Sequence, residues 1–231
     1  MVYILIADWI KFLGKWGPMY FEGTIVTLEI SFLGVFIGLF LGLFVALMRM
    51  SKNKVANIIS SAYVEIIRGT PLVVQVMLFC YGLITLIPAQ YPWLKNSFVL
   101  AMVAICINSS AYVSEVIRSG LQSVDKGQME AARSLGMSPK QAMRHVIIPQ
   151  AIKIVLPALG NEFVTLIKES AIVAFVGIKD IMYYAKVVSG SSYKTFTAYI
   201  TAALIYFVIV FTLSKLLQVY ERRLNANDSR A

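Results

Sequence analysis

The sequence predicts an all-α membrane protein with about five transmembrane helices, and two observations carry that prediction. Of the 231 residues, 58% are hydrophobic and only 14% are charged, and the mean hydropathy is +0.74. Apolar runs of the length that crosses a bilayer recur along the chain, and short polar connections separate them. This composition excludes an ordinary soluble domain, and the chain is long enough for a single bundle of spans.

The apolar runs and the residues that interrupt them give the positions of the spans. The second run contains Pro71, which we expect either to kink the span or to mark where an interfacial lead-in becomes the true span. The predicted spans are, in order, 24–48, a stretch within 58–87, 98–116, a stretch within 156–178, and 198–219.

The chain before the first span is interpreted as an N-terminal interfacial segment, residues 1–23. Aromatic residues that favour the headgroup region stand in it, namely Trp9, Trp16 and Tyr20. The transmembrane domain is predicted to cover residues 24–222, and residues 223–231 are predicted to form a cytoplasmic tail.

The net charge of +9 gathers at the ends of the predicted spans, which is typical of the positive-inside rule and not of a nucleic-acid surface. The basic residues that set the orientation are Arg49, Lys52 and Lys54, then Arg118, Lys126, Arg133, Lys140 and Arg144, then Arg222, Arg223 and Arg230. The connection between the second and third spans has only Lys95. Five spans then place the N-terminus outside and the C-terminus in the cytoplasm. Lys179, Lys186 and Lys194 fall on the predicted outer side, and we interpret their segment as an interfacial amphipathic helix and loop.

Residues 119–145 are the long polar break of the chain, and capping signals predict two short helices in the loop of residues 119–149. Asp125 can cap the first helix, with Gln128 three residues later as its capping-box partner. Gly136 suits the left-handed position that ends this helix. Because Glu130 and Arg133 are charged, we expect them to be exposed on it.

The second short helix of this break has its own signals. Ser138 is a good N-cap, with Pro139 at the first helical position and Gln141 at the third. Pro149 is expected to end or kink the helix. The alternative interpretation is an ordinary helical hairpin that links two spans.

The order Glu130-Ala131-Ala132, three residues, Gly136, then aliphatic Val146 and Ile148 and Pro149 resembles the EAA loop of the membrane subunits of binding-protein-dependent ABC importers. In such subunits this cytoplasmic loop docks into an ATPase, and small alanines permit close approach. The resemblance implies an ATPase-coupling site made of Glu130, Ala131, Ala132, Arg133, Leu135 and Gly136.

Charged side chains also stand inside predicted spans, where facing lipid would cost several kcal/mol each. Glu65 and Arg68 are three residues apart and so share a helix face, and Glu115 and Arg118 have the same spacing. For both pairs we favour structural ion pairs over a polar pathway.

Glu162 differs, because no charged residue stands three or four positions from it, and we favour a pathway role for it with Asn161 beside it. Lys168 and Glu169 follow within about two helical turns. Asn108 and Ser109, in the middle of the third span, fit helix–helix hydrogen bonding and pathway lining equally well.

Glycine and proline interrupt two apolar runs, at 68–71 and 156–161, and predict broken helices of the kind that often lie near substrate in transporters. Gly34, Gly38 and Gly42 repeat every four residues and predict a strip for close helix packing.

The sequence lacks several patterns that catalytic or cofactor sites use. Cys80 and Cys106 lie in apolar runs and are interpreted as core residues. His145 is the only histidine, which leaves no metal cluster to predict. No phosphate-binding G-x-x-x-x-G-K-[ST] pattern occurs. We therefore expect no catalytic site and no cofactor on this chain.

Beyond the loop, the chain from about 20 to 222 resembles the permeases of polar amino-acid ABC importers, the branch that includes histidine, glutamine, arginine and cystine importers. The stretches that carry the resemblance are 65–75, 108–118, 125–136, 157–163 and 168–170. Glu169 stands where the branch has Asp at least as often. The resemblance implies a type I ABC importer (MetI-like) permease fold in the bacterial cytoplasmic (inner) membrane.

The same resemblance implies partners. Two permease subunits, identical or homologous, form the pore, and a cytoplasmic ATPase dimer that binds ATP and Mg drives it. An extracytoplasmic binding protein delivers the amino acid, membrane lipid surrounds the pore, and no nucleic acid is involved. Together with the charges above, the resemblance gives a set of candidate pathway residues: Glu162, Asn161, Asn108, Ser109, Glu65, Arg68, Gln75, Lys168 and Glu169.

Two other classes of function are alternatives to an importer permease. A secondary carrier or channel working alone would be expected to show an inverted repeat or a symmetric pore motif, and neither is evident. A receptor-like or assembly subunit would lack substrate-stimulated ATPase activity in a reconstituted complex. The identity of the amino acid, and the choice between a homodimeric and a heterodimeric pore, stay open.

Overall fold

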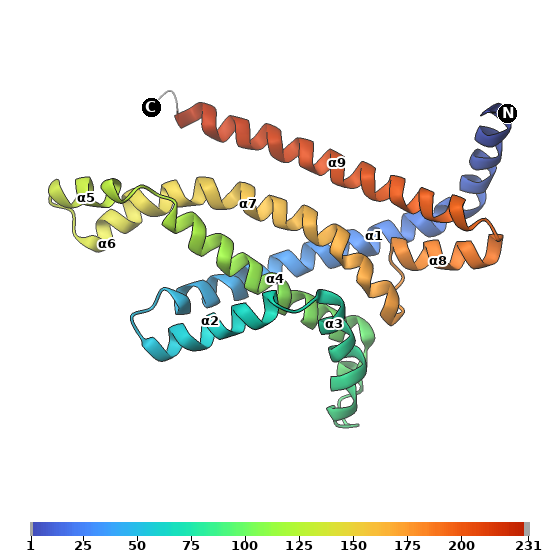
Figure 1. The fold of residues 1–231 in the computed structure, drawn as a ribbon, viewed down its shortest axis with the longest axis horizontal. Coiled ribbons are helices and arrows are strands. Elements are labelled where there is room, and N and C mark those ends of the chain that lie inside the picture. The colour runs from blue at the N-terminus through green and yellow to red at the C-terminus, as the bar shows by residue number, and fades with distance from the viewer. Residues whose placement is uncertain (1, 229–231) are drawn as a thin grey trace. The chain divides into compact units, whose positions relative to one another are not determined.

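The computed structural model describes residues 2–228, with side chains for residues 8–223, and the regular elements in this part of the chain are helices (Figure 1). In chain order the α-helices are α1 (Val2–Arg49), α2 (Lys54–Arg68), α3 (Leu72–Met77), α4 (Ser97–Gln122), α5 (Lys126–Ser134), α6 (Pro139–Ala142), α7 (Ile148–Glu169), α8 (Ile181–Ser192) and α9 (Thr195–Asp228). Segments of π-helix cover Leu78–Gly82 and Met143–Ile147, and 3₁₀ turns cover Leu83–Leu86, Pro92–Lys95 and Ser170–Val176.

Four helical stretches are long and apolar enough to cross a membrane, and the pair formed by α2 and Leu72–Leu86 makes a fifth if it counts as one span. The prediction of about five spans is therefore confirmed. The helix that contains the fourth predicted span begins before that span, because α7 starts at Ile148 and continues the helix of Met143–Ile147 without a loop. The predicted helix within the connection before the last span is also present, as α8.

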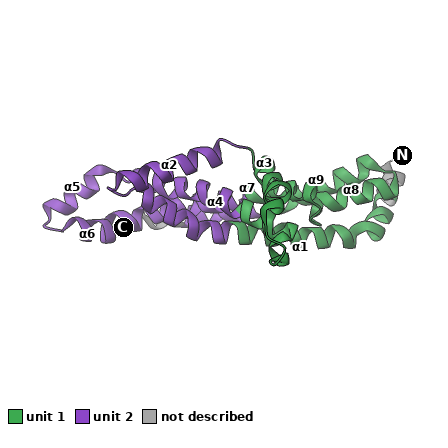
Figure 2. Cartoon of the chain, turned by 90° about the horizontal axis from the view of Figure 1, so that it is seen from below, with its two compact units in different colours: residues 1–34, 71–105, 165–212 green, residues 35–70, 106–164, 213–231 purple. Residues whose placement is uncertain are grey.

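The chain divides into two compact units, each made of three separate stretches (Figure 2). Unit 1 contains 1–34, 71–105 and 165–212, and unit 2 contains 35–70, 106–164 and 213–231.

Helix α1 is continuous through Pro18 and through the expected boundary at residue 23. At 1.5 Å per residue, its 48 residues make about 72 Å of helix measured along its axis, more than twice the hydrocarbon thickness of about 30 Å. Only part of α1 can therefore lie in the hydrocarbon core. Tyr20, interpreted above as a headgroup anchor, is instead buried and donates a hydrogen bond to the Ala198 carbonyl oxygen at 2.8 Å.

The predicted break at 68–71 is confirmed, since α2 ends at Arg68 and α3 begins at Leu72. Pro71 has no N–H and disfavours helical dihedrals in the residue before it. The Thr70 hydroxyl donates to the Ile66 carbonyl oxygen at 3.0 Å, so a side chain occupies an acceptor at the end of the helix.

The second predicted break is wrong, because α7 runs without interruption through Pro157 and Gly160. Pro157 costs the helix one backbone hydrogen bond, which membrane helices tolerate. Gly160 has a packing role: a Cβ at this position would overlap the Leu217 side chain of α9. In α7 the glycine therefore provides close contact between helices, and it does not interrupt the backbone.

The glycine strip of α1 is a packing device, as predicted. In unit 2 a Cβ on Gly38 would lie 2.5 Å from Ser109 Oγ, and one on Gly42 would lie 2.7 Å from the Val113 side chain. In unit 1 a Cβ on Gly34 would lie 2.8 Å from Ile105. These contacts hold α1 closely against α4 in each unit. Cys80 and Cys106 are buried free thiols, which confirms their interpretation as core residues.

Candidate functional site

The polar loop of unit 2 begins with α5, and its start differs in one detail from the prediction. Asp125 caps the helix, with Oδ1 accepting a hydrogen bond from the Gly127 N–H at 2.6 Å. The Gln128 side chain does not reach back to complete a capping box. Its Oε1 instead accepts a hydrogen bond at 3.2 Å from Gln150, at the start of α7. A tertiary partner thus replaces the local one and joins α5 to α7.

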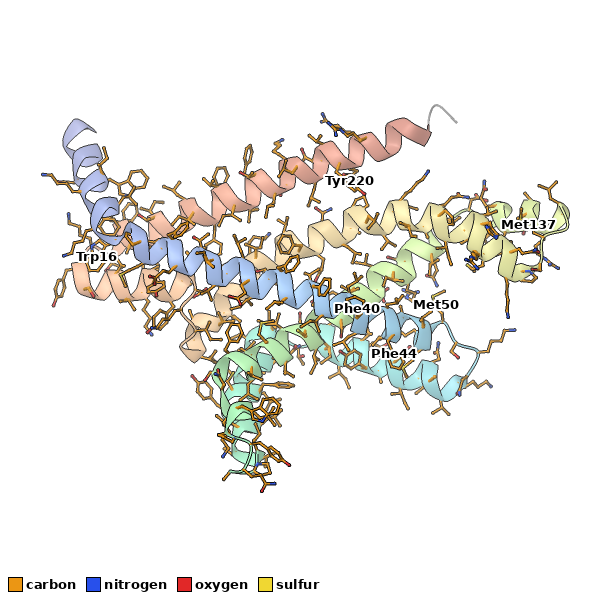
Figure 3. All side chains as sticks on the ribbon, turned by 180° about the vertical axis from the view of Figure 1, so that it is seen from behind. Trp16, Phe40, Phe44, Met50, Met137 and Tyr220 are labelled. Atoms are coloured by element: carbon orange, nitrogen blue, oxygen red, sulfur yellow. The ribbon has the colours of Figure 1, made fainter. Side chains whose placement is uncertain are left out.

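The end of α5 is the glycine turn that the sequence predicts. Gly136 has φ +85°, and the Met137 N–H donates to the Ala132 carbonyl oxygen at 3.2 Å. The Gly136 N–H donates to the Arg133 carbonyl oxygen at 3.0 Å, which completes a Schellman motif. This geometry fixes the turn between α5 and α6, where Met137 is labelled in Figure 3.

The start of α6 confirms the second capping box. The Gln141 N–H donates to Ser138 Oγ at 3.3 Å, and the Ser138 N–H donates to Gln141 Oε1 at 2.8 Å. Pro149 was expected to end or kink the helix, and it does not end it. The π-helical turn Met143–Ile147 directly precedes α7. The backbone hydrogen bonds have therefore already left the α-helical pattern near Pro149, which has no N–H to donate.

The two short helices present a small exposed surface and a buried base. Glu130, Ala131 and Arg133 are exposed, and Leu135 is 82% exposed although it is apolar. Ala132 was expected to allow a partner to approach, but it is only 4% exposed and packs within its own chain. Figure 1 shows α5 and α6 beyond the ends of α4 and α7.

An apolar cluster supports this surface from below. Its buried members are Val124, Ile147 and Ala151, and Leu121, Met129, Met143 and Val146 pack against them. The cluster joins the end of α4, the loop and the start of α7. The cluster therefore connects the loop directly to two membrane helices.

A second feature of unit 2 is a carboxylate surrounded by arginines. Glu115 contacts Arg118, as predicted, and also Arg49 at the end of α1. Arg68 Nη1 lies 3.9 Å from Glu115 Oε2, and its guanidinium lies 5.3 Å from the centre of the Tyr112 ring. The predicted Glu65–Arg68 pair is therefore wrong. A partner on α4 replaces the one on the same helix, and Glu65 is exposed.

The other pathway candidates of unit 2 differ in burial. Asn108 and Ser109 are buried in α4, Glu162 is half-buried in α7, and Asn161 is exposed. Among the described residues, Ser109 Oγ is the one buried side-chain polar atom with no hydrogen-bond partner, and it faces Gly38. This contact favours a packing role for Ser109.

In unit 1, Gln75 is buried in α3, and Lys168 and Glu169 are exposed at the end of α7. Unit 1 also holds a buried acid that sequence reasoning missed. Asp180 is 0% exposed and caps α8, with Oδ1 accepting from the Tyr183 N–H at 2.7 Å. Tyr206 donates to its other oxygen at 3.4 Å.

Burial raises the pKa of Asp180 to about 6, against the hydrogen bonds that favour its charged form. A neighbouring hydroxyl, that of Tyr184, donates to Glu22 at 2.7 Å, and this bond is the main cause that raises the pKa of Tyr184 to about 12. The sequence signal for Asp180 was its position as an N-cap before α8.

The fold and the loop together define a class: a multi-span membrane component that carries an exposed polar loop of two short helices. Residues 34–226 match the family described as binding-protein-dependent transport system inner membrane component. The chain belongs to this family, and it is a permease subunit with several membrane-spanning helices in the inner membrane.

Relatives cover nearly the whole chain. A putative glutamine transport system permease protein of Rickettsia typhi is 37% identical over 221 residues, 94% of this chain and 100% of the relative. A probable glutamine ABC transporter permease protein of Bacillus subtilis is 43% identical over 89% of this chain and 93% of the relative. An arginine transport system permease protein of the same organism is 40% identical over 91% of this chain and 94% of the relative.

Solved structures agree with the fold. A chain in a structure described as an amino acid ABC transporter with histidines is 50% identical, with a TM-score of 0.85 over 91% of this chain and 96% of that chain. A chain of the MetNI methionine ABC transporter has a TM-score of 0.72 at 20% identity, over 89% of this chain and 96% of that chain, and supports the fold alone. The type I importer permease fold is thus confirmed, and a stand-alone carrier is not favoured.

Proposed function

We propose that this permease subunit belongs to an ATP-driven amino-acid importer and couples to its ATPase through residues 119–149. The names of the relatives support the substrate class, since they refer to glutamine and arginine transport. The solved structure that shares 50% identity with this chain is described as an amino acid ABC transporter. The observation that carries the coupling role is the doubly capped loop with exposed Glu130 and Leu135.

The proposed assembly has a pore made with a second permease subunit, identical or homologous. A cytoplasmic ATPase dimer, which binds ATP and Mg, contacts the coupling loop, and an extracytoplasmic binding protein delivers the amino acid. The Lys and Arg distribution supports an N-terminus outside and a C-terminus inside. A cysteine at Gly127 should then react only with reagents on the cytoplasmic side, and one at Gln90 only with reagents outside.

The mechanism we infer is alternating access. When ATP closes the ATPase dimer, the coupling loop moves with the surface that holds it. The Schellman turn and the Ser138 capping box keep the loop rigid, and the apolar base joins it to α4 and α7. The motion reaches the spans because no flexible connection lies between the loop and α7.

The coupling role is tested in the complete complex reconstituted in liposomes, with import and ATP hydrolysis measured together. Glu130→Lys reverses an exposed charge, and Gly136→Val places a β-branched residue at φ +85°, so each should reduce import per ATP hydrolysed. Gly136→Asn is the matched control, because asparagine tolerates the left-handed conformation. Import at the parental rate by correctly assembled Glu130→Lys and Gly136→Val complexes would disprove the docking role.

For the pathway, Glu162 is our first candidate for contact with the substrate ammonium group, because it is a half-buried carboxylate in a membrane-spanning stretch. Glu162→Gln removes one charge-assisted hydrogen bond, about 1.5–3 kcal/mol, or about ten- to a hundredfold in apparent affinity for the amino acid. Assembly and basal ATPase activity should remain. Unchanged transport would make Glu162 a structural residue.

A further inference from the structure

Unit 2 contains an apolar groove at the loop end of its membrane helices. The groove has a volume of about 540 Å³, and α1, α4 and α7 and the residues beside them contribute its walls. Such a volume lies within the range of about 300–1,000 Å³ that small-molecule sites occupy. All fourteen residues that line it are apolar, so the groove suits a hydrocarbon chain and not a polar substrate.

The helix periodicity explains why the lining is continuous. On α7, Ile148, Ile152, Val155 and Leu159 recur at intervals of four, three and four residues, which places them on one face. The lining residues of α1 have the same kind of spacing, and Met50, labelled in Figure 3, continues the lining directly after the helix. The two helices thus present apolar stripes to the same space.

The segments at the end of the groove are strongly basic. Residues 50–54 and 140–153 include no acid, and their cations are Lys52, Lys54, Lys140, Arg144 and Lys153. Lys52 follows the lining residue Met50 by two positions, and Arg144 follows the lining residue Met143 directly. Both cations are exposed. An apolar groove with a cationic end matches the two parts of an anionic lipid.

We propose that this groove binds an acyl chain of an anionic phospholipid from the cytoplasmic leaflet, with Lys52 and Arg144 at its headgroup. The occupant follows from the charge complementarity and from the inner membrane in which the family resides. Leu121 and Met143 line the groove and also pack in the cluster below the coupling loop. A bound acyl chain therefore contacts the side chains that support that loop.

The test uses the complete complex in nanodiscs and a phosphatidylglycerol that carries a photoreactive group on one acyl chain. Peptides that contain groove residues should be labelled. Ile152→Trp fills the groove from a side chain that is 48% exposed, and it should lower this labelling several-fold. Ile154→Trp, on the same helix and 46% exposed, does not line the groove and should leave labelling unchanged. Gel filtration checks that each variant complex is assembled.

The headgroup is tested by the double variant Lys52→Gln, Arg144→Gln. Loss of two cations should weaken phosphatidylglycerol labelling about twenty- to thirtyfold, at about fivefold per charge, and leave labelling by the matching phosphatidylcholine probe unchanged. Lys186→Gln, an exposed cation of unit 1, is the control.

Three results would overturn the proposal: equal labelling of the parent and Ile152→Trp, equal labelling by the two lipids irrespective of the two cations, or crosslinks to a second permease copy from a photoreactive amino acid placed at position 152. The last would make the groove an interface between subunits. Because labelling requires neither import nor ATP hydrolysis, failure of the proposed amino-acid transport would leave these results unaffected.

Discussion

Glu115 in unit 2 and Asp180 in unit 1 show two ways to hold a carboxylate inside a membrane protein. Glu115 is surrounded by three guanidinium groups, those of Arg49, Arg68 and Arg118. Asp180 is fully buried and accepts hydrogen bonds from a backbone N–H and from a tyrosine hydroxyl. The first carboxylate is balanced by full charges and the second by dipoles.

This difference determines what each site tolerates. Three guanidinium groups and one carboxylate give the Glu115 site a net charge of +2. The carboxylate therefore offsets repulsion among the three arginines. Around Asp180, the carboxyl can take up a proton without leaving any charge unbalanced. We therefore expect neutralisation of Glu115 to lower the stability of the protein, and neutralisation of Asp180 to raise it.

The largest expected effect is at Glu115. Glu115→Gln leaves three guanidinium groups around a neutral amide, and breaking such a pair costs about 3–5 kcal/mol when it is buried. Because the Glu115 side chain is 22% exposed, we expect the lower end of that range, seen as a large fall in the melting temperature of the purified complex.

The double variant Glu115→Gln, Arg118→Gln separates charge balance from simple loss of contact. It should recover part of the lost stability, because one unbalanced cation is removed. Glu221→Gln, an exposed acid near the end of α9, is the control. A parental melting temperature for Glu115→Gln would show that the arginines do not depend on this carboxylate.

The two sites also show what the sequence could predict. The Glu115–Arg118 contact was predictable, because residues three apart on a helix are neighbours. Arg49 was not, since it is 66 positions from Glu115 and meets it only through the packing of α1 on α4. A contact between helices also explains why the predicted Glu65–Arg68 pair is absent, because Arg68 lies next to Glu115 of α4 instead. Asp180 was recognisable as a cap, whereas its burial depends on α9.

The polar loop of residues 119–149 was predicted in most of its detail because its signals are local. Gly136 and the Ser138–Gln141 capping box act within a few residues of themselves. Prolines were less predictable. Pro71 follows Gly69 and Thr70, and the helix is interrupted there. Pro157 instead lies inside α7, which continues through it. Local sequence gives the potential for a break, and packing decides whether one occurs.

The next effect in size is at Asp180. Its pKa is about 6 in the folded protein and 3.8 in the unfolded reference, so between those values the folded state binds more protons. Stability from this group is therefore fully present below pH 3.8 and is lost as the pH rises to about 6, by at most about 3 kcal/mol. Asp180→Asn keeps the cap and removes the charge.

We expect Asp180→Asn to be more stable than the parent at pH 7 and to approach it at pH 4. Melting temperatures of the purified complex across this range measure the difference. The variant amide can donate to the Tyr206 hydroxyl oxygen, which the parent carboxylate cannot do. A variant that melts below the parent at pH 7 would show that the charged form is required.

The smallest effect concerns the hydroxyl beside this site. Tyr184→Phe removes the hydrogen bond to Glu22 and leaves the ring in place, which should cost about 1–2 kcal/mol at pH 8. The pKa of Tyr184 rises from 10.0 to about 12 on folding, so this stabilisation is complete below pH 10 and is lost as the pH approaches 12. The difference in melting temperature between parent and variant should therefore shrink on going from pH 8 to pH 11. Tyr183→Phe is the matched control, because no hydrogen bond of its hydroxyl is present among the described residues. If Tyr183→Phe and Tyr184→Phe lower the melting temperature equally, the hydrogen bond to Glu22 contributes nothing to stability. Packing would then matter more than dipoles for the stability of this site.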